Sequence, residues 1–179
     1  GGAGPTILTA TFLLLGEDVL TYKNNQQIYK KSATDAQSID FGREIGVREV
    51  VRLNLIECES CGAALGIPTV ETFFGTSPPL WNRLFVMMAR LLPQKTLQDR
   101  ELMTGLALFS LPMVRLVDSF VGSKNGIRVD ITDKSGQTHW ALLTHNDLEK
   151  CVGDALAAFA SQILHQNIIP GVYFPEEVK

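Results

Sequence analysis

THNDLEKCVGDALAAFASQILHQNIIPGVYFPEE, residues 144–177, predicts the end of a strand, a long helix and an abrupt stop. Asn146 is placed to cap the helix, and Glu149 would complete a capping box. One apolar face recurs at helical spacing: Leu148, Val152, Ala155, Leu156, Phe159, Ile163 and Leu164. A second stripe has small side chains that allow another backbone to approach: Gly153, Ala157, Ala160 and Ser161. We therefore expect this helix to be covered on more than one side, before Pro170 and Gly171 end it.

Two strands are predicted just before that helix. Residues 126–132 and 138–144 flank a turn at 133–136. The first strand alternates an apolar side (Ile127, Val129, Ile131) with a polar side (Arg128, Asp130, Thr132). A two-stranded sheet with one apolar face needs a covering layer, and we expect the 146–166 helix to supply it.

The remaining segments mix helices and hairpins without regular alternation of strand and helix. They are a helix at 6–15, a hairpin at 19–22 and 27–29, a loop at 32–46, a strand at 47–55, a helix at 57–65, a strand at 70–74, a helix capped by Ser77 before Pro78 and Pro79, and helical residues 96–109 that Pro112 kinks or restarts. This order predicts an α+β fold, with a mixed, largely antiparallel sheet and helices packed on one face. At 179 residues the chain suits a single domain, residues 1–179.

The composition of the chain excludes some classes of binding partner. The net charge is −3 and no run of Lys or Arg occurs, so we expect no nucleic acid partner. No apolar run reaches the ~18 residues of a membrane span, so we expect no membrane partner. The mean hydropathy of +0.10 is slightly apolar and indicates a buried face, either an oligomer interface or a contact with another domain. Three cysteines, an odd number, fit a reducing, cytoplasmic setting.

Two short motifs suggest chemistry and are each incomplete. The glycine-rich start, GGAGP, lacks the third glycine and the preceding strand of a dinucleotide fingerprint, and Pro5 removes an N–H donor. Cys58 and Cys61 form a C-x-x-C pair without further ligands at metal-binding spacing and without a βαβ context. We expect no cofactor-binding and no metal-binding residues here, and interpret both motifs as ordinary loop and helix sequence.

The polar side of the predicted hairpin is the stronger candidate for a substrate site. Arg128 could bind a carboxylate bidentately, Asp130 shares its side, and His145 ends the return strand. The alternative is a solvated outer face with a local Arg–Asp pair, which is common on protein surfaces. Asn54 and Glu57, at the end of another strand, could also line a cleft or serve local capping. Trp81, on the first turn of the Pro-started helix, is expected in the core.

Four segments together resemble one family: GAGPTILTATFLLLGE (2–17), LNLIECESCGAALGIPTVETFFGTSPPLWN (53–82), IRVDITDKSG (127–136) and PGVYFPEE (170–177). The chain is similar to the second half of saccharopine dehydrogenase-like oxidoreductases, related to saccharopine reductase, and most to their plant and cyanobacterial branch. The resemblance implies a two-part enzyme, in which an N-terminal Rossmann domain binds NAD or NADP. It implies that this chain is the C-terminal domain, which helps bind an amino-acid-like small-molecule substrate and forms a homodimer.

The sequence leaves three hypotheses for the function of this chain. The first is the substrate-binding and dimerisation domain just described, inactive without its own N-terminal Rossmann domain, with catalytic residues unassigned. The second is a non-enzymatic dimerisation or protein-interaction domain of a parent that has lost dehydrogenase chemistry. The third is a small thiol or metal protein that uses Cys58 and Cys61.

Overall fold

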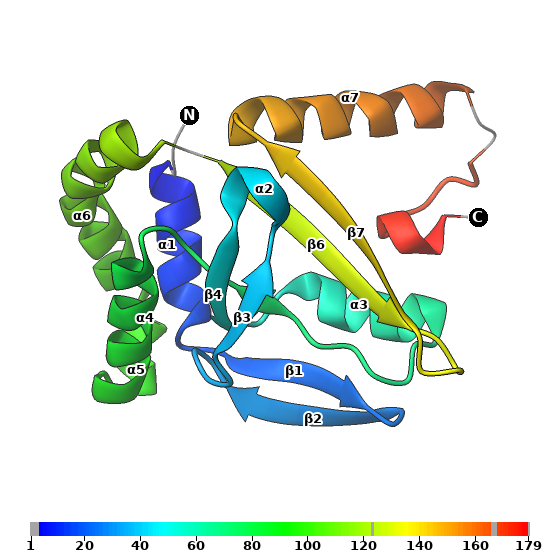
Figure 1. The fold of residues 1–179 in the computed structure, drawn as a ribbon, viewed down its shortest axis with the longest axis horizontal. Helices are drawn as coiled ribbons and strands as arrows, with labels where there is room; N and C mark the ends of the chain where they lie inside the picture. Colours follow the sequence, from blue (N-terminus) through cyan, green and yellow to red (C-terminus); the bar gives the residue numbers. More distant parts are fainter. Residues whose placement is uncertain (1–3, 123, 166–167, 179) are drawn as a thin grey trace.

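The computed structural model describes residues 4–122, 124–165 and 168–178, and within them the chain has an α+β fold (Figure 1). Helices α1 (Pro5–Leu14), α4 (Pro79–Leu91), α5 (Gln94–Leu97) and α6 (Arg100–Val121) gather at one end of the molecule. Small antiparallel sheets and α3 (Ile56–Leu65) form the middle, and α7 (Leu148–His165) and the short 3-10 helix η1 (Pro175–Glu177) lie at the other side. Residues 1–3, which include part of the glycine-rich start, lie outside the described residues.

The strands divide among three sheets, and every described pairing is antiparallel. The first holds β1 (Asp18–Lys23) and β2 (Gln26–Lys31), the second holds β3 (Gln37–Asp40), β4 (Val47–Arg52) and β5 (Phe73–Phe74), and the third holds β6 (Asn125–Thr132) and β7 (Thr138–His145). The turn between β1 and β2 is the predicted one, because Asn24 and Asn25 take φ values of 52° and 64°. Positive φ at both central residues fits the twist of a two-residue hairpin.

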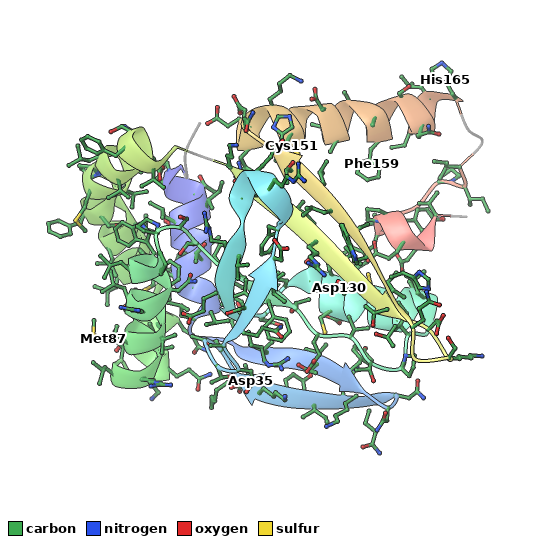
Figure 2. All side chains as sticks on the ribbon, in the orientation of Figure 1. Asp35, Met87, Asp130, Cys151, Phe159 and His165 are labelled. Carbon is green, nitrogen blue, oxygen red and sulfur yellow. The ribbon has the colours of Figure 1, made fainter. Side chains whose placement is uncertain are left out.

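Helix α7 departs from the expectation that it is covered on more than one side. Between Leu148 and His165 it has no buried residue. Figure 2 shows Phe159 pointing from α7 toward the side where β7 and η1 lie, yet half of this side chain stays exposed. The residue that caps the helix is Asp147 rather than Asn146, because the Asp147 carboxylate accepts the Lys150 backbone N–H at 3.0 Å. The first turn is thus capped in the usual way, one residue later than predicted.

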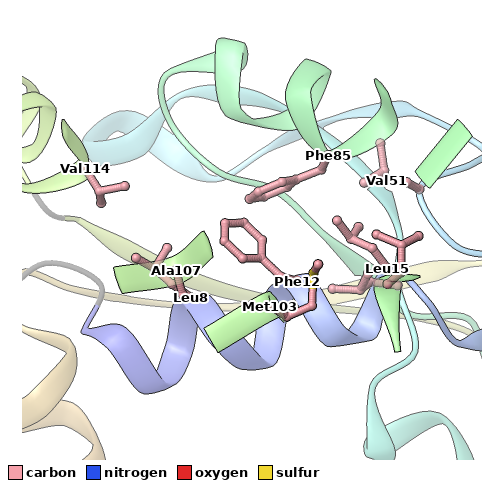
Figure 3. Packing of buried hydrophobic residues seen from close by; sticks show 11 residues of the cluster. Leu8, Phe12, Leu15, Val51, Phe85, Met103, Ala107 and Val114 are labelled. Atoms are coloured by element: carbon pink, nitrogen blue, oxygen red, sulfur yellow. The ribbon is translucent and has the colours of Figure 1, made fainter. Parts of the chain in front are cut away.

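Among the described residues, one hydrophobic core forms where α1 meets α4, α5, α6 and β4 (Figure 3). It contains Leu8, Phe12, Leu15, Ala33, Val51, Leu53, Phe85, Leu97, Met103, Ala107 and Val114. Phe12 and Phe85 meet edge to face, with ring centroids 6.0 Å apart, which is a favourable aromatic arrangement. Trp81 packs against this core as predicted. Helix α6 continues through Pro112 to Val121 instead of restarting there.

Two local predictions were wrong for identifiable reasons. The stretch at 32–46 is not a plain loop, since it holds β3 and the single turn of α2 (Gly42–Ile45). Asp40 accepts the Gly42 N–H at 2.9 Å, and Gly42 and Gly46 both have positive φ, so this tight turn depends on an Asx interaction and two glycines. Ser77 does not cap α4: Pro78 is its N-cap residue, without a side-chain cap, and Pro79 takes the first helical position.

A buried arginine ties the middle of the fold together. Arg52 is 2% exposed, and its guanidinium has four contacts: hydrogen bonds to Asp35 (2.9 Å), Glu71 (2.9 Å) and Thr21 (3.2 Å), and the ring of Phe73 at 4.8 Å. Lys30 also pairs with Asp35 and Glu71, so two cations balance two carboxylates. The Arg52 backbone further bonds to Ala33 and Thr34. A buried charge satisfied in this way fixes β1, β4 and the 32–35 segment relative to one another.

Acid should weaken this cluster through Asp35. Hydrogen bonds from Lys30 and then Arg52 hold the pKa of Asp35 below its ordinary value of 3.8. A carboxyl group whose pKa is lower in the folded state adds stability above its unfolded pKa and loses it as the pH falls through the folded pKa. We therefore expect the free energy of unfolding to decrease below about pH 5, and to decrease less steeply in Asp35→Asn. Urea unfolding between pH 3 and 6 measures both slopes, and equal slopes would contradict this role.

Candidate functional site

Arg128 lies on the side of the β6–β7 hairpin that faces the β3–α2 turn. Its Nε and Nη2 donate to Asp130 at 2.8–3.1 Å, and its Nη1 donates to the carbonyl of Asp40. The guanidinium also lies over the Trp140 ring, 5.2 Å from the centroid. Gly126 and Leu142 on the same side contact the 41–45 segment. Arg128 and Asp130 therefore do come together, but each satisfies the other, and a carboxylate ligand would have to displace Asp130.

His145 lies on the opposite side of the hairpin. It pairs with Asn125 across the strands, whereas Arg128 pairs with Leu142 and Asp130 with Trp140. Cross-strand partners lie on the same side of a sheet, and successive residues along a strand alternate between its two sides. His145 shares the side of its partner Asn125, which is three residues before Arg128, so His145 and Arg128 lie on opposite sides. Its Nδ1 accepts the Asp147 backbone N–H at 3.0 Å, which supports the start of α7. The structure does not bring these three residues into one site, and a role for any of them in substrate binding stays a prediction.

The two cysteines of the C-x-x-C pair lie on α3 as free thiols. Cys58 is buried and donates to the carbonyl of Val70 at 3.3 Å. Cys61 lies 3.8 Å from the Glu176 carboxylate. Burial is the main cause that raises the pKa of both thiols, which disfavours the reactive thiolate. Over the described ranges, no group of three metal-ligating side chains comes together, and Cys58, Cys61 and Cys151 are free.

Asn54 serves the scaffold rather than a site. Its Nδ2 donates to Glu17 at 2.7 Å, and its Oδ1 accepts the Leu20 N–H at 3.3 Å. Asn54 therefore connects the end of β4 with the start of β1. Glu57 lies in the first turn of α3, where a carboxylate favours the positive end of the helix dipole.

A cleft of about 380 Å³ opens where α1 ends and β1 begins. We call it the α1–β1 cleft; it is lined by Leu15, Gly16, Glu17, Asp18, Lys31, Ser32, Ala33, Thr34, Ala89, Arg90, Leu92, Gln94 and Leu97. Its buried lining residues are mainly apolar, namely Leu15, Ala33 and Leu97. A Cβ on Gly16 would lie 2.8 Å from the Cβ of Leu97, so glycine is required for this close approach. Gln94 and Gln98 both donate to the Gly16 carbonyl, which fixes the chain at the cleft.

The rim of the α1–β1 cleft carries one cation that is free to bind a ligand. Lys31 pairs with Asp18 at 2.8 Å, and Glu17 is engaged by Asn54. Arg90, in the last turn of α4, is exposed and has no hydrogen-bond or ion-pair partner within the part of the chain that the structure describes. A guanidinium of this kind can take a carboxylate bidentately while the apolar walls take an aliphatic group. No sequence motif marks Arg90, because only the fold shows which cations remain unpaired.

Searches against protein-family models, curated proteins and solved structures found no match for this chain. Arg90 at the α1–β1 cleft could accept a carboxylate more readily than Arg128, because Asp130 already pairs with Arg128.

We expect leucine to bind weakly in the cleft and isoamylamine, which lacks the carboxylate, to bind more weakly still. Arg90→Gln should weaken leucine binding by about tenfold, the value of a hydrogen bond to a charged group. Arg83→Gln, seven residues earlier on the same helix and equally unpaired among the described residues, is the matched control. Chemical-shift titration measures each affinity and identifies the perturbed residues. Equal leucine affinities in the two variants would rule out Arg90 as the anchor.

Proposed function

We propose that this chain is the substrate-binding and dimerisation domain of an NAD(P)-dependent, saccharopine dehydrogenase-like oxidoreductase. The four segments quoted above support the family, and the α+β architecture is compatible with such a domain. The observation that carries the dimerisation half of the proposal is an apolar hairpin face that nothing in the described chain covers.

The open face belongs to the third sheet. Ile127, Val129, Ile131 and Leu143 are 61%, 50%, 59% and 53% exposed. They share one side by register, and that side is opposite to the one that contacts the β3–α2 turn. The helix expected to cover it, α7, has its own apolar residues exposed. A two-stranded ribbon with an open apolar side is marginal by itself, so a second copy is the natural covering layer.

The total surface supports an assembly. The chain exposes 12238 Å², whereas a monomer of 19.7 kDa is expected to expose about 8,600 Å². The excess of about 3,600 Å² is more than one partner contributes to most homodimer interfaces. A second copy and the parent's Rossmann domain could together cover it.

The residues of this chain suggest which of the two domains binds the dinucleotide and which binds the substrate. The described part of the glycine-rich start has Gly4 as the N-cap of α1 and Pro5 at its first position. NAD or NADP is accordingly assigned to the Rossmann domain, and an amino-acid-like substrate to the α1–β1 cleft. Three free cysteines support a cytoplasmic parent enzyme.

A second candidate is a non-enzymatic dimerisation or protein-interaction domain, which the same open apolar face favours. The two candidate functions predict different sequences for the rest of the parent protein. A strand–GxGxxG–helix unit supports the oxidoreductase, because that unit holds the pyrophosphate of a dinucleotide. A degenerate glycine-rich loop supports the non-enzymatic domain.

We expect the chain to be a dimer, and we expect a charged side chain introduced on the apolar hairpin face to disrupt it. We expect Val129→Lys to shift sedimentation from dimer to monomer, because a lysine would be desolvated in the interface. Val47→Lys is the matched control, since Val47 is another exposed strand valine and faces Asp40 across β3 and β4. A wild-type monomer, or equal effects of the two substitutions, would contradict the proposed interface.

The chain alone should not bind the dinucleotide. We expect fluorescence titration with NADPH or NADH to show no saturable binding, because the phosphate-binding fingerprint is incomplete. Addition of the parent's Rossmann domain should restore binding. A micromolar dissociation constant for the chain alone would overturn the division of labour between the two domains.

A further inference from the structure

Helix α6 has two apolar faces, and only one of them is covered. The inner face, with Met103, Ala107 and Val114, packs into the core against α1. The outer face consists of side chains that are half or more exposed: Leu102, Leu108, Phe109, Met113, Leu116 and Phe120. Phe109 and Phe120 are 84% and 82% exposed. Leu102, Phe109, Met113, Leu116 and Phe120 follow one another at i+7, i+4, i+3 and i+4 spacing and form one stripe along the helix, and Leu108 lies to one side of it.

The length and composition of α6 would suit a membrane helix, and it is the one helix of this kind in the described parts of the chain. Only 11% of its apolar window is buried inside the molecule, so α6 is not an ordinary core helix. It is not placed to cross a bilayer either, because its inner face is committed to α1 and Arg115 and Asp118 interrupt its second half. A helix with these properties can lie on a bilayer surface.

The charge around α6 is the reverse of the charge on the rest of the chain. Residues 78–124, which include α4, α5 and α6, contain six cations and three anions and so carry +3. The other residues contain ten cations and sixteen anions and carry −6. Helix α4 adds Leu80, Met87 and Leu91 to the exposed apolar residues, and Figure 2 shows Met87 pointing away from the body. This end of the molecule is thus both apolar and basic.

Most of the cations at this end also have no ion-pair partner among the described residues. Arg83, Arg90, Lys95, Arg100 and Arg115 are exposed and have no ion-pair or hydrogen-bond partner among the residues that the structure places. Lys124 alone of the six has a partner, Glu44 at 3.9 Å. Unpaired cations at the same end of the molecule as an apolar stripe are what an anionic surface attracts.

We propose that the α6 face, meaning the outer stripe of α6 with the basic residues at 83–115, binds the surface of an anionic lipid bilayer. The helix lies parallel to the membrane, its phenylalanines enter the acyl boundary, and the arginines meet the lipid phosphates. The sequence predicted no membrane partner because no apolar run reaches the ~18 residues of a membrane span; the residues of this stripe recur periodically and form no such run. The proposal does not depend on the dehydrogenase assignment, since it concerns another face than the hairpin.

Vesicle flotation of the 179-residue chain tests the proposal. We expect binding to phosphatidylcholine vesicles that contain phosphatidylserine, little binding to phosphatidylcholine alone, and release by salt. Arg83→Gln with Arg115→Gln should weaken binding by about fivefold for each cation. Phe109→Ser with Phe120→Ser should weaken it at least tenfold, since two buried aromatic rings are lost.

The matched control is Leu156→Ser with Leu164→Ser on α7, which removes two equally exposed apolar side chains from an acidic region. This variant should bind vesicles as the wild type does. Sedimentation without lipid separates the other occupants of the stripe. If the Phe109/Phe120 variant changes the oligomeric state, a second copy covers α6 and the lipid proposal fails. It also fails if charged and neutral vesicles bind equally or if the α7 variant loses binding. If both the Phe109/Phe120 variant and the α7 variant remain dimers, the proposed hairpin interface stands, independently of the result with vesicles.

Discussion

The packing around α1 is the constraint on which the rest of the structure depends. Leu8 and Phe12 on α1 meet Met103 and Ala107 on α6 and Phe85 on α4 in the one core that the described chain closes. The β6–β7 hairpin attaches to the body only along one side, with Gly126 against Phe41 and Ile45 and Arg128 on the Asp40 carbonyl. The inner faces of α4, α5 and α6 pack into the core around α1, and no described element covers the outer side of the hairpin, α7 or the outer side of α6.

These uncovered surfaces differ in charge, and that difference suggests different partners. Residues 125–177, with the hairpin and α7, contain three cations and seven anions, whereas the α4–α6 end carries +3. An apolar sheet side in acidic surroundings can pair with its own two-fold copy, since the like charges can stay at the rim. An apolar stripe among unpaired arginines suits a polyanionic surface instead. The excess of exposed surface therefore includes two apolar surfaces whose surroundings carry opposite net charge.

The sequence predicted the elements whose signal is local. Pro5 at the start of α1, Asn24 and Asn25 in the first hairpin, and the alternation along β6 each act within a few residues. It could not predict the partner of a face. The pattern of Ile127, Val129 and Ile131 predicts that this side is buried, but does not say whether α7 or another molecule would bury it. Register likewise separates His145 from Arg128, and only the paired strands reveal that parity.

The candidate site shifted for a related reason. An arginine beside an aspartate in sequence suggests a binding site, yet Arg128 is satisfied by Asp130, and Arg52 by Asp35 and Glu71. A satisfied guanidinium holds the scaffold, because a ligand must first break bonds of equal strength. Arg90 has no such partner in the described chain and faces a cleft with apolar walls. An arginine is available to a ligand only where no internal carboxylate pairs with it, and long-range packing decides which arginines those are.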